Sequence, residues 1–395
     1  MKRVDVAIIG AGAAGLSLAD RLCATGPRSL AVRLIDAPPG PLRPPRRTWC
    51  FWEAGAGRYD AAVTRAWSRL RVHSPQGAAF DDCIGPLRYK MIRSDDFEHL
   101  IGRHLTDRPG FERCEGTVET IEGTVDGARV LMRTSNGGPE SLAARWVFDS
   151  RPLKGLPAAR TTLIQHFHGW FIRTHAPLFD PERVELMDFR VPQPQNGLAF
   201  CYVLPTSRHT ALVEYTQFSA GLLRDEEYDQ ALHFYVQRVL GTRMFDVEET
   251  EHGVIPMTDA RFPRSSAPSV FRIGAAGGAT RPSTGYTFAT IQRQASAVAR
   301  AVAEGRTPVP PPPHSRRSQA MDAVFLHGLA CGRLNGGEFF TRLFSRAPMA
   351  RLLRFLDGDT NLLQDIAIGI HTPVGPMLRS AMELPTRRRR PSATP

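Results

Sequence analysis

A glycine-rich turn near the N-terminus has the spacing of a dinucleotide-phosphate site. An apolar run at residues 4–9 predicts a buried strand, and the pattern G-x-G-x-x-G then opens a helix rich in small residues. Gly10 would form the tight turn, Gly12 would let the backbone approach a pyrophosphate, and Gly15 would let helix and strand pack closely. The free N–H groups of the helix start would face the phosphates. The predicted phosphate-binding residues are Gly10, Gly12, Ala13, Ala14 and Gly15.

An acidic residue stands at the distance that this motif requires. Asp36 ends a second predicted strand, residues 31–35, and lies 21 residues after Gly15. Its carboxylate could accept hydrogen bonds from ribose hydroxyls. A glycine-rich turn without a ligand is the alternative. Strand, helix and distal acid together favour dinucleotide binding.

A second strand–loop–helix pattern occurs late in the chain. A predicted strand at residues 271–273 leads into a loop at 274–285 and a helix at 287–302, and mostly β-forming sequence from about 160 to 260 separates this unit from the first. A nucleotide-binding domain split around such an insertion favours FAD over NAD. The loop residues that we expect near the isoalloxazine ring are Gly274, Gly277, Gly278, Thr284 and Gly285.

Glu214 is the candidate acid. It lies in an otherwise apolar stretch, residues 210–216, where burial would raise its pKa and keep it protonated near neutral pH. A general acid needs that protonation state. On the pattern alone, a glutamate pointing into water from an alternating strand is the better interpretation.

These residues predict an α/β protein with a Rossmann-like FAD-binding domain, an inserted antiparallel β substrate domain and a C-terminal helical region. The FAD-binding domain takes residues 1–80, 110–155 and 265–305. The substrate domain takes residues 81–109 and 156–264. A proline-rich linker (306–315), a helical tail (316–385) and a disordered end (386–395) follow.

Composition narrows the function classes. The 395 residues are 42% hydrophobic, and the six cysteines are scattered without a C-x-x-C pair, which argues against a zinc site or a disulfide framework and suits a reducing compartment. His166 and His168 share a strand face without nearby carboxylates, so we expect no metal site. Neither a signal peptide nor a nucleic-acid module is visible, and we expect a cytoplasmic protein that binds no nucleic acid.

The net charge of +11 is uneven, because residues 316–395 hold twelve arginines against six acidic residues. Residues 339–346 and 351–356 predict helices with a broad apolar face and a basic face. Such helices can lie on a membrane surface. Ordinary packed helices whose arginines face water are an equally good interpretation.

Six motifs follow one another between residues 4 and 300. They are Arg-Thr-Trp-Cys-Phe-Trp at 47–52, Ile-Arg at 92–93, Asp-Ser-Arg at 149–151, Ala-Leu-Val-Glu-Tyr-Thr at 211–216, Arg-Ile-Gly-Ala-Ala-Gly-Gly at 272–278 and Pro-Ser-Thr-Gly-Tyr at 282–286. As an ordered set they resemble the motifs of FAD-containing lycopene β-cyclases of the bacterial and plant type.

The resemblance implies an isomerase-type enzyme of carotenoid biosynthesis. Such flavoproteins need FAD in its reduced form, with NAD(P)H as electron source, but catalyse no net redox change. They close the acyclic ψ-ends of lycopene or a related acyclic carotenoid into β-ionone rings. The resemblance also implies a protein held peripherally on the inner face of the cell membrane, near other carotenoid enzymes.

The signature acid of this family lies in a Phe-Leu-Glu-Glu-Thr segment. Here residues 212–216 read Leu-Val-Glu-Tyr-Thr, so Glu214 is kept and Tyr215 replaces the second glutamate. One candidate carboxylate remains, which puts a two-carboxylate mechanism in doubt. The resemblance favours a catalytic Glu214 and leaves open whether Glu214 or the reduced flavin delivers the first proton.

Further site residues follow from the same motifs. Arg47 could contact the FAD phosphates, although an exposed structural arginine is as good an interpretation. Aromatic rings could line a polyene tunnel and stabilise cations through their faces, although bare aromatics more often belong to a core. The candidate substrate-binding residues are Trp49, Phe51, Trp52 and Tyr286.

Two other functions compete with cyclisation. A flavin-dependent monooxygenase or reductase acting on a lipid or aromatic substrate would share the fold, but Ala275 stands where many flavin hydroxylases carry aspartate. A catalytically inactive nucleotide-binding protein would not need Glu214.

Overall fold

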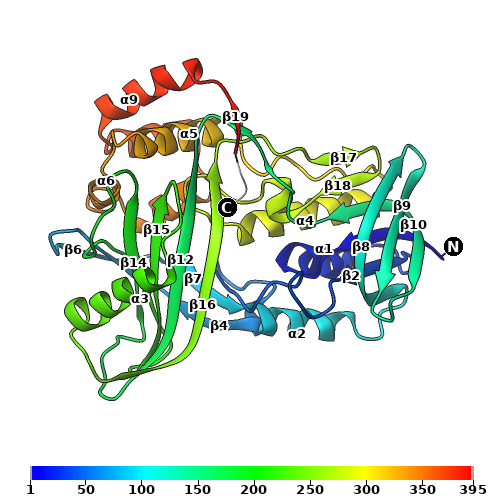
Figure 1. Ribbon diagram of the computed structural model, residues 1–395, viewed down its shortest axis with the longest axis horizontal. Helices are drawn as coiled ribbons and strands as arrows, with labels where there is room; N and C mark the ends of the chain where they lie inside the picture. The colour runs from blue at the N-terminus through cyan, green and yellow to red at the C-terminus, as the bar shows by residue number, and fades with distance from the viewer. Residues whose placement is uncertain (1, 393–395) are drawn as a thin grey trace.

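Two seven-stranded sheets stand side by side in the computed structural model, which describes residues 2–392 (Figure 1). The first carries the glycine-rich turn. Its strands, in spatial order, are β1 (Lys2–Ile9), β2 (Val32–Asp36), β8 (Phe111–Thr124), β9 (Gly127–Thr134), β10 (Pro139–Asp149), β18 (Val270–Arg272) and β17 (Ser265–Ala267). Strand β1 runs parallel to both β2 and β10, and β10 runs parallel to β18, so the late strand returns to the N-terminal sheet as the sequence predicts.

Helices cover this first sheet. They are α1 (Ala13–Thr25), α2 (Ser94–Leu105) and α4 (Phe288–Ala303), and α1 packs against both of the others. Apolar side chains of all three helices and of β1 and β2 form one buried cluster. Residues 94–105, which we assigned to the substrate domain, therefore lie with the nucleotide-binding layer, because α2 buries Phe97 and Ile101 against α1.

The second sheet is mostly antiparallel and forms the predicted insertion. Its strands, in spatial order, are β16 (Phe245–Thr258), β12 (Thr162–Thr174), β15 (Thr210–Ser219), β14 (Leu198–Pro205), β13 (Arg183–Asp188), β5 (Arg69–His73) and β6 (Ala79–Cys83). Strand β5 pairs parallel with β13. Residues 69–73, which we placed in the FAD-binding domain, thus belong to this sheet, because a strand is held by its ladder partner rather than by its sequence neighbours.

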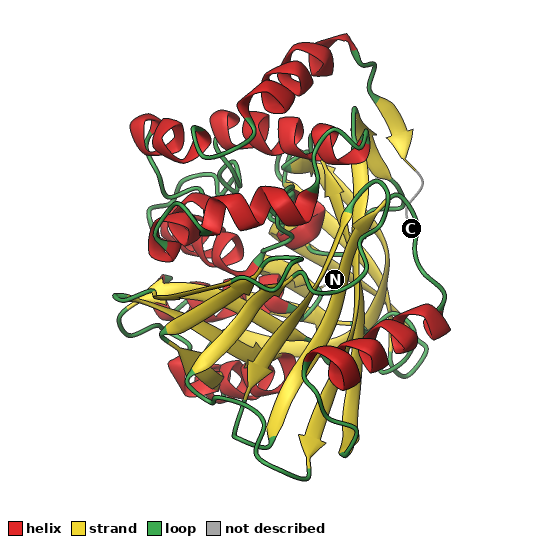
Figure 2. Ribbon diagram, turned by 90° about the vertical axis from the view of Figure 1, so that its left-hand side faces the viewer, coloured by secondary structure: helices red, strands yellow, loops and turns green. Residues whose placement is uncertain are grey.

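Helices lie on both sides of the second sheet (Figure 2). Helix α3 (Asp225–Phe234), followed by a π-helical turn (Tyr235–Val239), packs on β12 and β15. A small third sheet of β3 (Thr48–Ala54), β7 (Leu87–Arg93) and β4 (Val63–Trp67) adds strands that bring the aromatic segment toward the centre of the molecule.

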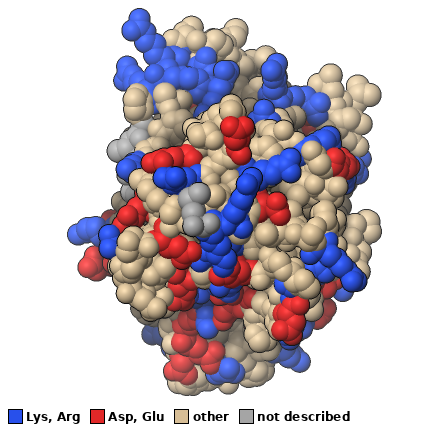
Figure 3. Space-filling view, turned by 90° about the vertical axis from the view of Figure 1, so that its right-hand side faces the viewer, with Lys and Arg blue, Asp and Glu red and all other residues tan. Residues whose placement is uncertain are grey.

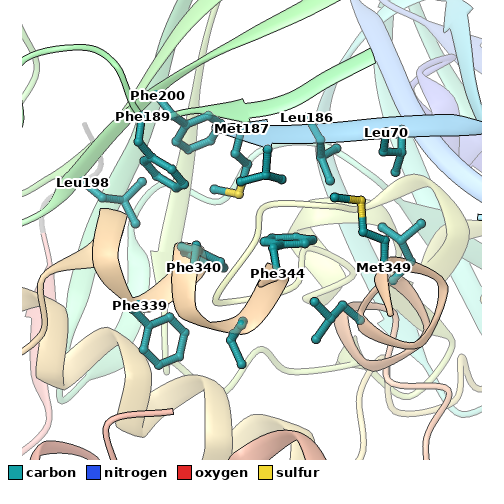
Figure 4. Close-up of a cluster of buried hydrophobic side chains, with 14 of the residues drawn as sticks. Leu70, Leu186, Met187, Phe189, Leu198, Phe200, Phe339, Phe340, Phe344 and Met349 are labelled. Carbon is teal, nitrogen blue, oxygen red and sulfur yellow. The ribbon is translucent and has the colours of Figure 1, made fainter. Parts of the chain in front are cut away.

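The helical tail packs onto the second sheet. It comprises α5 (Arg316–Ala330), α6 (Gly336–Phe344), α7 (Met349–Leu356), α8 (Leu362–Gly369) and α9 (Val374–Glu383). Phe340 and Phe344 of α6 and Met349 of α7 point at Leu186, Phe189 and Phe200 of the sheet region (Figure 4). The apolar faces at residues 339–346 and 351–356 are therefore core surfaces, which decides between the two interpretations that the sequence left open.

The C-terminal segment is ordered up to residue 392. We expected residues 386–395 to be disordered, but β19 (Arg390–Ser392) pairs with β11 (Leu156–Ala159). Arg389 fixes the segment by donating to the carbonyls of Ala158 and Asp259, at 3.1 and 3.0 Å. Residues 393–395 lie outside the described residues. Between residues 2 and 392, no helix has both the length and the apolar character that crossing a bilayer requires.

Candidate active site

A cavity of about 440 Å³ lies between the two sheets, at the carboxyl ends of β1 and β2. Its wall changes character from one end to the other. The nucleotide end is formed by Ala11, Gly12, Ala13, Ala14, Asp36 and Arg43. The opposite end is formed mainly by Trp49, Tyr89, Phe167, Tyr202, Leu204, Leu212, Glu214, Glu251, Val254, Ile255 and Tyr286. This position at a strand-to-helix switch is where open α/β sheets bind ligands.

The glycine-rich turn has the geometry that its spacing predicts. Gly10 adopts φ +92°, and a Cβ on Gly15 would lie 1.9 Å from the Gly10 carbonyl oxygen. Only glycine permits that approach of α1 to β1. A Cβ on Gly12 would meet nothing within 4 Å, because it would point into the cavity. The start of α1 at Ala13 therefore borders open space of the kind a pyrophosphate occupies.

Asp36 is buried at the edge of the cavity. It accepts hydrogen bonds from the N–H groups of Ala11, at 3.2 Å, and Ala37, at 3.0 Å. The guanidinium of Arg113 lies 2.9 Å from its other oxygen. These contacts fix the carboxylate at the edge of the cavity.

Arg47 supplies a cation to the wall of the same cavity. Its Nε is buried without a hydrogen-bond partner among residues 2–392, and burial lowers the pKa of the guanidinium while the negative charge of Glu251 raises it. A desolvated, incompletely paired guanidinium is costly unless an anion completes its contacts. The open face at Gly12 and the start of α1 fit a pyrophosphate such as that of FAD.

The late loop closes over the start of α1. Gly274 adopts φ +64°, and a Cβ there would lie 2.9 Å from the Cβ of Ala14. Gly274, Thr284 and Gly285, which are among the residues predicted to lie near a flavin ring, line the cavity. Gly277 and Gly278 do not reach the wall of the cavity; Gly278 instead lies beside the ring of Phe262.

Glu214 faces the cavity from β15. Glu214 is half-buried, and desolvation raises its pKa to about 8, with a further increase from the charge of Glu251. The hydroxyl of Thr216 donates to its Oε1 at 2.8 Å and lowers the pKa in part. The carboxyl group is consequently protonated at neutral pH, so the outward-facing alternative does not apply to this residue.

A second carboxylate, which the sequence analysis did not identify, lies beside Glu214. Glu251 of β16 is 8% exposed, lines the same cavity and accepts a hydrogen bond from the Thr48 hydroxyl at 2.7 Å. In the sequence it belongs to an acidic run, residues 248–251, that is typical of a solvated strand. Only the pairing of β16 with β12 brings it to the cavity.

The aromatic candidates divide between the cavity and the core. Trp49 lines the cavity and stacks on Phe288 with ring centroids 5.9 Å apart. Tyr286 lines it as well. The rings of Phe51 and Trp52 do not reach the cavity wall: Phe51 stacks on Phe288 at 4.6 Å, and Trp52 packs edge-on against Tyr286 at 4.7 Å. These two candidate substrate-binding residues therefore support the wall from behind.

Three tyrosine hydroxyl groups lie close together at the apolar end, from the buried Tyr89 and the half-buried Tyr202 and Tyr286. The Tyr286 hydroxyl lies 3.3 Å from that of Tyr89 and 3.5 Å from that of Tyr202. Tyr202 is the register neighbour of Glu214 on β14. Burial raises the pKa of Tyr286 to about 12, so its hydroxyl group stays neutral at physiological pH.

A separate buried cluster of His73, Glu185 and Asp188 has donor atoms within 4.8 Å of one another. Arg71 pairs with Glu185 and Arg190 pairs with Asp188. Both carboxylates are thus already matched by cations, and the cluster is a structural ion-pair network.

A family comparison identifies the chain. The family described as lycopene cyclase protein matches residues 5–382, almost the whole sequence. The chain belongs to the lycopene cyclase family. The resemblance drawn from the six motifs is thereby confirmed.

Curated relatives agree with the family. The lycopene cyclase chain is 29% identical over 317 residues to the lycopene beta-cyclase of Pseudescherichia vulneris, covering 77% of this chain and 76% of that protein. It is 25% identical to the chloroplastic/chromoplastic lycopene beta cyclase of Capsicum annuum, over 76% of this chain and 60% of the plant protein.

Solved structures show the fold of this lycopene cyclase family member. A geranylgeranyl bacteriochlorophyll reductase-like protein from Thermoplasma acidophilum matches with TM-score 0.62 at 13% identity, covering 97% of this chain and all of that chain. A flavoprotein/dehydrogenase from Cytophaga hutchinsonii matches with TM-score 0.62 at 12% identity, covering 98% of this chain and 99% of that one. The α/β flavoprotein fold predicted from the sequence is confirmed.

Proposed function

We propose that this protein cyclises the ψ-ends of lycopene, or of a related acyclic carotenoid, into β-ionone rings. The observation that carries the proposal is the protonated Glu214 at the apolar end of a cavity whose other end fits FAD. Membership of the lycopene cyclase family and the names of the curated relatives support the same reaction.

Ring closure needs a proton, a dry cavity and negative charge near a carbocation. Glu214 donates its proton to the terminal C1=C2 double bond of the polyene, and a tertiary cation forms at C1. The C5=C6 bond attacks that cation, which closes the six-membered ring and moves the positive charge to C5. Loss of a proton from C6 then gives the β-ring. Substrate and product are isomers, so the reaction has no net redox change.

The apolar wall excludes water that would trap the cation. Leu204, Leu212 and Ile255 line the end that carries Glu214. The faces of Trp49 and Tyr286 stabilise positive charge without reacting with it. FAD, when bound in its reduced form with NAD(P)H as the electron source, supplies negative charge beside this end of the cavity.

Expression in a lycopene-accumulating bacterium tests the proposal. We expect the red pigment to be replaced by γ- or β-carotene, seen by chromatography of the extract. Purified enzyme should convert lycopene only under reducing conditions, and NADPH consumption should not scale with product. Unchanged lycopene from soluble, flavin-loaded protein, with stoichiometric NADPH oxidation, would instead favour a flavin-dependent monooxygenase or reductase.

We further propose that the protein binds peripherally to the membrane that holds its substrate, beside the enzymes that supply it. Helices α8 and α9 support this, because they expose a continuous set of large apolar side chains. These are Leu362, Leu363, Ile366, Ile370, Val374, Leu378 and Met382. On the face shown in Figure 3, Lys and Arg gather toward the end of the molecule that carries α9, where they suit anionic headgroups.

Replacing two of these side chains should release the protein from lipid. Leu363 is 77% exposed and Met382 is 71% exposed. We expect the double variant Leu363→Glu, Met382→Glu to bind anionic vesicles about tenfold or more weakly in a flotation assay, since each apolar side chain contributes roughly 1.5 kcal/mol or more when it leaves water. Val125→Glu is the matched control, because Val125 is 81% exposed in the β8–β9 turn. Equal loss in both variants would contradict the α8–α9 assignment.

A further inference from the structure

We propose that Glu251 is a second catalytic residue, the base that removes the C6 proton from the ring cation after Glu214 has donated the first proton. The proposal rests on the cyclase function proposed above. It assigns the choice of β-ring over other ring isomers to a residue outside the motif that carries Glu214.

The sheet register places the two carboxylates together. Gly169 of β12 is directly opposite Glu214 of β15 on one side and Glu251 of β16 on the other. Residues that are directly opposed in antiparallel strands project from the same face. Both glutamates therefore point into the same cavity from strands that flank β12.

The absence of a side chain at residue 169 lets the two groups converge. A Cβ on Gly169 would lie 2.9 Å from the Cδ1 of Leu212, 3.2 Å from the Cγ of Glu251 and 3.5 Å from the Cβ of Glu214. The two side chains thus pass over the bare glycine. Any other residue there would press on the stems of both glutamates and on Leu212.

Their surroundings make the two groups unequal. Burial raises the pKa of both glutamates, but Glu251 accepts from the Thr48 hydroxyl and is stabilised by the nearby charge of Arg93, against the opposing charge of Glu249. Arg47 adds a further attractive charge at Glu251. Glu214 has only the Thr216 hydroxyl and faces Cys50, Tyr202 and Tyr286, which are uncharged at neutral pH. A single shared proton accordingly resides on Glu214, and Glu251 is the carboxylate.

No other carboxylate in the described part of the chain is placed to act as that base. The cavity wall also contains Asp36 and Glu98, but both contact Arg113 at the nucleotide end. Glu251 lies next to Val254 and Ile255, at the end where the polyene would bind.

Glu214 and Glu251 together account for every proton that is moved in the reaction. Glu214 loses a proton to C2, and the electron pair of C1=C2 becomes the new C–H bond. The C5=C6 pair becomes the C1–C6 bond, and the electrons of the C6–H bond then re-form C5=C6 as Glu251 takes the proton. Transfer of that proton from Glu251 to Glu214 across Gly169 restores the starting state. No external acid, base or oxidant is consumed.

The test is the product spectrum of Glu251→Gln in the flavin-loaded full-length enzyme with lycopene. We expect ring formation to fall about 100-fold or more. The residual product should contain isomeric rings from proton loss at C4 or at the C5 methyl group, because no base faces C6. Glu251→Asp should partly restore β-rings, and Glu248→Gln, an exposed residue of the same strand that pairs with Arg173, should behave as wild type.

Two further measurements distinguish a catalytic role of Glu251 from a purely structural one. With Glu251 neutral, the pKa of Glu214 falls, so the alkaline limb of kcat/KM should move to lower pH; a purely structural defect would not move it. If Glu251→Gln does not fold, Gly169→Ala, which crowds both carboxylates, should retain flavin and lose activity at least about tenfold. Wild-type rates with β-rings alone in Glu251→Gln would overturn the proposal. A wild-type enzyme that forms no rings would overturn the cyclase function as well.

Discussion

Glu214→Gln is expected to abolish ring closure while FAD stays bound. Glutamine has nearly the same shape and can still accept the hydrogen bond that Thr216 donates at 2.8 Å, but it cannot give up a proton to a double bond. Loss of a general acid typically costs 10²–10⁴-fold in rate, and an unactivated alkene has no other route to the cation, so we expect a fall of roughly 1000-fold or more.

The measurement is lycopene conversion under anaerobic, reducing conditions, with flavin content and melting temperature recorded for the same sample. Glu214 lies at the end of the cavity opposite the nucleotide end. The glutamine that replaces it should therefore leave the flavin spectrum and the ratio of flavin to protein unchanged. Glu248→Gln again serves as the matched surface variant. Near-normal product from Glu214→Gln would show that the first proton comes from another donor, the reduced flavin among them.

The role of Glu214 as an acid also predicts how activity changes with pH. Burial and the charge of Glu251 raise the pKa of Glu214 to about 8, and the acid works only while protonated. Activity should therefore be fully present below that pKa and decline as pH rises through about 8. An ordinary exposed glutamate would already be ionised near pH 4 and would predict no activity at neutral pH.

Local chemistry was predictable from the sequence where it depends on neighbours in the chain. Gly10, Gly12 and Gly15 belong to one turn and one helix start, and their spacing alone determines which glycine faces the cavity and which one contacts the strand. Strand β1 and the late strand β18 were placed in one sheet for the same reason, since each is followed at once by a glycine-containing loop and a helix.

Residues brought together by register were not predictable. Glu251 lies 37 positions after Glu214, and only the two ladders on either side of Gly169 show that the two side chains share a face. A shift of one residue in the β12–β16 ladder would turn Glu251 away from the cavity, and the same shift in the β12–β15 ladder would turn Glu214 away. The substitution of the second glutamate of the family motif by Tyr215 suggested a single carboxylate, whereas the fold supplies another from a different strand.

The aromatic segment and the helical tail also contain residues whose surroundings the sequence alone did not predict. Side chains alternate along β3, so the adjacent rings of Phe51 and Trp52 pack into different cores, whereas Trp49, on the same face as Phe51, reaches the cavity. The amphipathic pattern of α6 is the same whether a sheet or a membrane covers it. Because α6 packs against Phe189 and Phe200, its apolar face belongs to the core. The exposed apolar side chains that could contact a membrane are instead on α8 and α9.

Gly12→Val is expected to give folded protein without flavin. A side chain at residue 12 would meet no protein atom within 4 Å, so the branched valine fits the fold and projects into the space that the pyrophosphate needs. We expect less than about a tenth of the wild-type flavin content, which corresponds to a loss of roughly 1.4 kcal/mol or more in binding free energy at limiting flavin.

Absorbance of the released flavin against protein concentration measures the effect, and circular dichroism checks the fold. Gly15→Ala is the informative contrast, because its Cβ would lie 1.9 Å from the Gly10 carbonyl oxygen and would separate α1 from β1. That variant should fail to fold, whereas Gly12→Val should lose only the cofactor and, with it, all ring formation. Flavin retained at the wild-type ratio in Gly12→Val would mean that the phosphates bind elsewhere. The assignment of the Gly12 side of the cavity to the nucleotide and of the Glu214 side to the substrate would then be wrong.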